Sequence, residues 1–181
     1  MIPELTESEA AEIIKKGGII IYPTEGIYGL GCDPLNKSSV EQVFKIKGRS
    51  KDKNFIILSS DIKYLINIIH SEFSQNDQLL NKDFTTWLVP NNEKCPSWLI
   101  KNEMIAVRLT NHKTVSKLCE LSQTALISTS ANLSGTSYDN DINKIKYIFK
   151  NKVDGIVQGE LGKEKKSSTI KNIITQETLR F

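Results

Sequence analysis

Short apolar runs that suit buried strands alternate along this chain with segments of helical periodicity. The strand-like runs occupy residues 19–22, 55–58, 85–89, 104–107, 125–127, 155–157 and 169–174. A first helix opens at the capping box Thr6–Glu9 and stops at Gly17-Gly18, and further helical patterns occupy 39–47, 61–69, 114–121 and 141–150. Strands alternating with helices, interrupted by strand-only stretches, predict an α/β fold with a mixed sheet.

The length of 181 residues fits a single domain over residues 1–181, which is large enough to bury a core without metal or disulfide staples. No stretch approaches the roughly 20 apolar residues that span a bilayer. The opening residues Met1–Glu7 are too polar and too acidic for a signal peptide. These features predict a cytoplasmic protein with no membrane segment.

The cysteines and histidines are too few and too scattered for a metal cluster or a disulfide framework. Cys32, Cys95 and Cys119 are odd in number and show no C-x-x-C spacing. The two histidines, His70 and His112, are far apart in sequence, which argues against a site built on several histidines. No metal-ligating residues are therefore predicted, and a reducing compartment is the expected setting.

The basic residues are divided unevenly between the two cationic types. Of 24 in total, 21 are lysine and three are arginine, namely Arg49, Arg108 and Arg180. An AT-rich genome would favour lysine, so the arginines either persist by chance or serve where a planar fork must hold a carboxylate or phosphate. Composition alone leaves both readings open. The net charge of +3 permits an anionic substrate or nucleic acid without requiring one.

Five segments combine the end of an expected strand or helix with residues that could bind a ligand, at 22–33, 47–53, 106–110, 128–135 and 159–170. The first is rich in glycine, which lets backbone N–H groups approach a ligand closely, although taken alone it also fits a strand-end turn. The second carries a cation at every second position, which suits a polyphosphate, although cations there also complement a helix dipole. Those cations are Lys47, Arg49, Lys51 and Lys53.

The remaining three segments place polar groups beside expected strands. Arg108 ends an apolar strand, where its charge must reach solvent or find an anion. Residues 128–135 put hydroxyls and an amide after a buried strand, which suits a binding loop or a polar turn. Residues 159–170 form a basic, glycine-hinged loop that could simply be solvated. Because no motif for a covalent nucleophile is present, an enzyme of this sequence would work by positioning and electrostatics.

Five motifs follow one another in order over nearly the whole chain. They are Tyr-Pro-Thr-Glu-x-x-Tyr-Gly-Leu-Gly at 22–31, Lys-x-Arg at 47–49, Val-Arg at 107–108, Ser-x-Asn at 130–132 with Ser134-Gly135, and Ser-Thr-Ile at 168–170. In this combination the chain resembles the YrdC/TsaC family of threonylcarbamoyl-AMP synthases. One such motif would be a weak signal, whereas five in register are specific. The length is similar to that of the short, single-domain bacterial members.

The resemblance implies an enzyme, a nucleotidyltransferase that forms L-threonylcarbamoyladenylate from L-threonine, bicarbonate or CO2, and ATP, with release of pyrophosphate. It implies a single-domain, twisted open mixed sheet with flanking helices and a concave, positively charged cleft. The product would feed t6A modification at position 37 of tRNA through TsaD, TsaB and TsaE-type partners, with direct tRNA contact left open. Mg2+ is expected to accompany ATP, held mostly by phosphate and water.

The same resemblance divides the expected site residues into two groups. Those expected to bind ATP are Lys47, Arg49, Lys53, Ser130, Asn132 and Arg180, with Lys47 and Arg49 also expected to be catalytic. Those expected to bind threonine are Thr24, Gly26, Arg108, Ser128 and Ser168. All three arginines fall on family positions, which favours function over chance. Both reactants are anions, so cations are needed to gather them and to offset the developing charge.

Three positions depart from the family pattern. Gly26 stands where many relatives carry Thr, Leu58 where longer relatives often have His, and Lys53 where Asn is frequent. An alternative function is an RNA-binding module that uses the same basic face without adenylation, although only 7% aromatic residues and no aromatic–basic interleaving argue against it. A third is the related carbamoyl-adenylate domain of hydrogenase-maturation proteins, but the zinc-finger and acyl-phosphatase segments that accompany it are not present.

Overall fold

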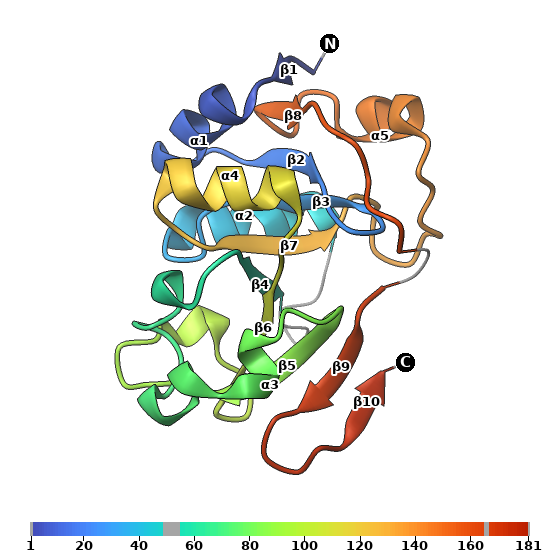
Figure 1. Ribbon diagram of the computed structural model, residues 1–181. Coiled ribbons are helices and arrows are strands. Elements are labelled where there is room, and N and C mark those ends of the chain that lie inside the picture. Colours follow the sequence, from blue (N-terminus) through green and yellow to red (C-terminus); the bar gives the residue numbers. More distant parts are fainter. Residues whose placement is uncertain (1, 49–54, 165–166, 181) are drawn as a thin grey trace.

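The computed structural model describes residues 2–48, 55–164 and 167–180 (Figure 1). Its strands are β1 Glu4–Leu5, β2 Ile20–Pro23, β3 Tyr28–Gly31, β4 Ile56–Ser59, β5 Thr85–Pro90, β6 Met104–Leu109, β7 Leu126–Ser130, β8 Gly155–Val157, β9 Thr169–Asn172 and β10 Thr178–Arg180. They follow one another in the order β1-β8-β2-β3-β7-β4-β6-β5-β9-β10. Since β4–β6 and β5–β9 are parallel whereas β3–β7 and β4–β7 are antiparallel, the predicted mixed sheet is confirmed.

The helices are short and follow local sequence signals. They are α1 Glu7–Lys15, α2 Lys37–Lys47, α3 Asp77–Leu80, α4 Lys113–Ser122 and α5 Ile142–Phe149, with 3-10 turns at Ile62–Tyr64, Ser71–Gln75 and Ser97–Leu99. The capping box of α1 forms as predicted, because the Glu9 N–H donates to Thr6 Oγ1 at 3.3 Å and the Thr6 N–H donates to the Glu9 carboxylate at 2.8 Å. In the described part of the chain, no helix is both long and apolar enough to cross a membrane.

The sheet carries apolar side chains on both faces. Ile21 of β2 and Ile19 just before it belong to one cluster of buried residues, whereas Ile20 and Tyr22 of β2 belong to the other. Successive strand residues point to opposite faces, so a strand covered on both sides reads as a continuous apolar run. Helices α1 and α4 lie side by side over one face (Figure 1), and α2 and α5 contribute to the cluster on the other.

The helix predicted at 61–69 is wrong. The structure has a 3-10 turn at Ile62–Tyr64, and Ile66, which the helical pattern placed on the buried stripe, is 52% exposed. The backbone beyond the turn is used by another segment, because the Asn92 N–H donates to the Ile68 carbonyl and Asn92 Nδ2 donates to the Ile66 carbonyl. These tertiary hydrogen bonds outweigh the weak local preference for a helix.

The glycine-rich segment 22–33 contains a strand that sequence reasoning missed. Within it, β3 pairs with β2 on one side and with β7 on the other. A Cβ atom built on Gly31 would lie 1.8 Å from the carbonyl oxygen of Ile127. This glycine therefore permits the close approach of a neighbouring strand rather than of a ligand. Sequence reasoning also missed β1 and β10, and the strand expected at 169–174 ends at Asn172.

Candidate active site

A pocket of about 340 Å³ lies on the sheet face that carries α1 and α4, beyond the part that these helices cover. Its floor is one row of register-paired residues across four strands, Ser128, Ile56, Ala106 and Leu88. The residues two positions away on the same face, Leu58 and Leu126, are fully buried in the cluster that includes α4. The volume falls in the range of small-ligand sites. Leu58, a predicted departure from the family, thus lies in the core and outside the described pocket lining.

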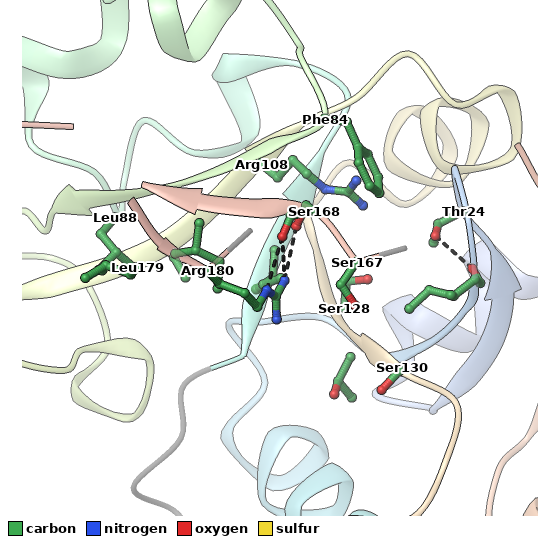
Figure 2. Close-up of a pocket in the computed structure, with 15 residues that line it drawn as sticks. Thr24, Phe84, Leu88, Arg108, Ser128, Ser130, Ser167, Ser168, Leu179 and Arg180 are labelled. Carbon is green, nitrogen blue, oxygen red and sulfur yellow. Dashed lines mark hydrogen bonds between the residues drawn. The ribbon is translucent and has the colours of Figure 1, made fainter. Parts of the chain in front are cut away.

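Polar side chains gather around this floor from segments far apart in the chain (Figure 2). The described lining includes two arginines, Arg108 and Arg180, and six hydroxyl residues, Thr24, Ser128, Thr129, Ser130, Ser167 and Ser168. Ser128 and Ser130 are two residues apart on β7, so both point to the same face. Of the residues expected to bind a substrate, Thr24, Arg108, Arg180, Ser128, Ser130 and Ser168 are therefore brought together.

Arg108 is the most deeply buried cation of this lining, with 5% of its surface exposed. Its Nη2 lies 3.0 Å from Oε2 of Glu25, and its Cζ lies 4.7 Å from the ring centroid of Phe84 (Figure 2). Within the described residues, Nε and Nη1 have no hydrogen-bond partner. Burial lowers the pKa of Arg108, and the negative charge of Glu25 opposes that shift. A buried guanidinium with two unpaired nitrogens at a pocket wall favours binding of an anion.

Arg180, the second arginine of the lining, reaches the segment that enters β9. Its Nε and Nη2 donate to the carbonyl of Ser168 at 3.2 and 2.8 Å, as the dashed lines in Figure 2 show. The Ser168 hydroxyl lies 2.8 Å from that of Thr86. Partial burial lowers the pKa of Arg180, and the positive charge of Arg108 lowers it further. An anion in the pocket would relieve this repulsion between the two arginines.

Lys47 joins the end of α2 to the loop after β7. It is 3% exposed, and its Nζ donates to the Ser130 carbonyl at 2.6 Å, the Asn132 carbonyl at 2.7 Å and Asn132 Oδ1 at 3.0 Å. The Ser130 hydroxyl donates to Asn132 Oδ1 at 2.6 Å. The structure thus brings these three predicted residues together. Neither Lys47 nor Asn132 is part of the described lining, and their contact with ATP stays a prediction.

Gly26 lies beside the pocket wall, where a Cβ atom would come within 2.6 Å of the Glu164 carbonyl oxygen. The chain passes close here because the Gly162 N–H donates to the Thr24 carbonyl and the Glu164 N–H to the Glu25 carbonyl, both at 2.9 Å. Gly26 is not part of the described lining, so its contact with threonine also stays a prediction.

Arg49 and Lys53, the other two expected ATP contacts, lie outside the described residues. That the cleft as a whole is positively charged therefore stays a prediction. Sequence reasoning missed the contacts that Glu25 and Phe84 make with Arg108. The carboxylate of Glu25 was visible in its motif, but no sequence pattern linked either residue to an arginine so distant in the chain.

The fold and the pocket together define a class, an α/β protein whose mixed sheet holds a hydroxyl-rich, arginine-bearing pocket on one face. A family model described as telomere recombination, Sua5/YciO/YrdC, matches residues 12–180. The chain belongs to this family.

Individual relatives agree with that membership. The threonylcarbamoyl-AMP synthase of Coxiella burnetii is 35% identical, with 96% of each chain covered. P. abyssi Sua5 complexed with L-threonine superimposes with a TM-score of 0.84 and 26% identity, covering 96% of this chain but 54% of Sua5, so this chain spans about half of that protein. E. coli YciO shares the fold, with a TM-score of 0.78, 23% identity, and 99% of this chain and 95% of YciO covered.

Proposed function

We propose that this protein is a threonylcarbamoyl-AMP synthase, a nucleotidyltransferase that forms L-threonylcarbamoyladenylate from L-threonine, bicarbonate or CO2, and ATP. The observation that carries the proposal is Arg108, a buried guanidinium with two unpaired nitrogens at the wall of a hydroxyl-rich pocket. It is supported by the similarity to proteins named threonylcarbamoyl-AMP synthase and to a Sua5 complexed with L-threonine. Because the relatives carry that name, the alternative of an RNA-binding module is not favoured.

The threonine carboxylate would bind the unpaired nitrogens of Arg108, where a planar fork suits a carboxylate. The hydroxyls of Thr24, Ser128 and Ser168 line the same space and would hold the polar groups of the amino acid. Phe84 packs against the guanidinium. These residues would fix threonine with its amine turned toward the rest of the pocket.

The reaction would proceed in two steps. The amine nitrogen of threonine forms a bond to the carbon of CO2 and loses a proton, which gives a carbamate. A carbamate oxygen then attacks the α-phosphorus of ATP, and the bond from that phosphorus to the bridging oxygen breaks, which releases pyrophosphate. Both partners in the second step are anions, so catalysis rests on positioning and on cations that offset charge.

The ATP side of the site would include Arg180 and the Ser130 hydroxyl from the lining, with Arg49 and Lys53 from the segment after α2. Lys47 would keep Ser130 and Asn132 in place through its hydrogen bonds. Mg2+ would arrive with ATP, since it prefers phosphate and water oxygens over a dedicated protein cage. Within the described residues, no group of three His, Cys, Asp or Glu side chains is arranged to hold a metal.

The product would be consumed by TsaD, TsaB and TsaE-type partners that transfer the threonylcarbamoyl group to tRNA. The test is pyrophosphate release by the purified protein, with threonine and bicarbonate each omitted in turn and the labile product analysed by mass spectrometry. Release that requires both, with the mass of threonylcarbamoyladenylate, supports the proposal. No release, together with no binding of ATP or threonine, refutes it, and an RNA titration at several salt concentrations would then test the alternative.

A further inference from the structure

Glu25 forms an ion pair with Arg108, the buried arginine of the pocket lining. Its Oε2 lies 3.0 Å from Nη2 of Arg108, and the side chain of Glu25 is 20% exposed. Glu25 itself is not among the described residues that line the pocket, whereas Arg108 is. The carboxylate is therefore placed to act on Arg108 rather than on a ligand.

Thr110 holds the second oxygen of this carboxylate. Its hydroxyl accepts the His112 N–H at 2.9 Å, so the one proton of the hydroxyl is directed to Oε1 of Glu25. Thr110 is 1% exposed, and its own N–H donates to the Ser59 carbonyl at the end of β4 at 2.9 Å. The backbone of Glu25 is held as well, because its carbonyl accepts the Glu164 N–H. Oε1 of Glu25 thus accepts a hydrogen bond from Thr110, whereas Oε2 contacts Arg108 as an ion pair and has no hydrogen-bond partner within the described residues.

We infer that Glu25, held by Thr110, is a positioning residue that orients the guanidinium of Arg108 for the carboxylate of the amino-acid substrate. This inference rests on the proposed function, since it names how that site recognises threonine. The contact engages one nitrogen, Nη2, and leaves Nε and Nη1 unpaired within the described residues. Phe84 packs against the guanidinium, which further restricts its rotation.

The variant Glu25→Gln separates a positioning role of Glu25 from a purely electrostatic one, because the two roles predict opposite changes in threonine affinity. If Glu25 only neutralised Arg108, then Glu25→Gln would leave a stronger positive potential and would tighten binding of a carboxylate. If Glu25 positions Arg108, the same change loosens the guanidinium and weakens binding. The sign of the change in threonine affinity therefore separates the two roles.

A second variant removes the support without changing any charge. Thr110→Val keeps the shape of the side chain and deletes the hydroxyl that holds Glu25, and Thr110→Ser restores that hydroxyl. We expect Thr110→Val to weaken threonine binding about fivefold to tenfold, the effect of one net hydrogen bond, and Thr110→Ser to recover most of it. The KM for ATP should stay unchanged. Glu12→Gln, which removes an exposed carboxylate paired with Lys15, is the matched control.

The experiment is calorimetric titration of L-threonine into the wild type and each variant, with thermal unfolding recorded for all. In parallel, the Nε–Hε resonances of arginine are followed, because the chain has only three arginines and Arg108→Lys assigns the relevant signal. We expect the Arg108 signal to shift in Glu25→Gln and Thr110→Val before any ligand is added.

The outcomes separate the inference from the proposed function. Weaker threonine binding in both variants, with an altered Arg108 signal and recovery in Thr110→Ser, supports positioning. Unchanged or tighter binding in folded variants overturns it while the wild type still binds threonine. A wild type that binds no threonine overturns the proposed function instead. The double variant gives a further test. If Thr110→Val lowers threonine affinity by the same factor in Arg108→Lys as in the wild type, the two changes are independent and the inference is overturned.

Discussion

Replacing Arg108 by lysine tests the chemistry of the pocket most directly. The change keeps a positive charge but replaces the guanidinium by a single ammonium group. One nitrogen of that guanidinium contacts Glu25, and two have no hydrogen-bond partner within the described residues. The ammonium would face Glu25 and could not also offer a planar pair of donors to a carboxylate. At least one charge-assisted hydrogen bond to the substrate is lost, which costs about 1.5–3 kcal/mol.

That loss converts to a rise of roughly 10-fold to 150-fold in the KM for threonine. The assay is the initial rate of pyrophosphate release, measured against threonine at saturating ATP and against ATP at saturating threonine. The KM for ATP should change little, because Arg108 is assigned to the amino acid. Lys117→Arg, a swap at an exposed position on α4 that lies outside the pocket lining, is the control. A threonine KM within about twofold of the wild-type value would refute the carboxylate assignment.

Three further predictions concern stability and reactivity. Gly31→Ala forces a Cβ atom against the Ile127 carbonyl, so we expect a loss of ~3 kcal/mol and a melting temperature lower by roughly 6–12 °C, with a much smaller effect of Gly29→Ala; equal melting temperatures would contradict this. Burial lowers the pKa of His112 below its usual 6.5, so the unfolded chain binds the proton at a higher pH than the folded chain does. The free energy of unfolding should therefore fall as pH drops below about 6.5. In urea titrations at pH 5 and 7, His112→Gln should reduce this difference in the free energy of unfolding. Burial raises the pKa of the Cys95 and Cys119 thiols to about 11 and raises that of Cys32 further. A thiol reagent at pH 8 should therefore react slowly with the native protein, and in urea it should react with all three cysteines. Rapid labelling of the native protein would argue against this packing.

Local signals predicted the parts of the fold that local interactions control. The capping box at Thr6, the apolar run of β2 and the helix expected at 114–121 each depend on residues a few positions apart, and each formed where expected. The apolar pattern at 61–69 is equally local, but the expected helix does not form there. Asn92 donates hydrogen bonds to the carbonyls of Ile66 and Ile68 instead. Periodicity reports which residues can be buried together, but it does not report which backbone groups a distant segment will use.

The candidate site likewise combines features that the chain predicts locally with contacts that depend on distant segments. The chain alone shows which chemical groups are available, namely three arginines among 24 basic residues and a set of hydroxyls at strand ends, and the order of motifs indicates the family. Which atoms those groups contact depends on how distant segments pack in the fold. Sheet register put Ser128 and Ala106 on either side of Ile56, and the chain fold brought the Glu25 loop to Arg108 and Lys47 to the end of β7. Such pairs arise from strand order and from the close approach that glycine allows at Gly31, and neither leaves a repeating trace in the chain.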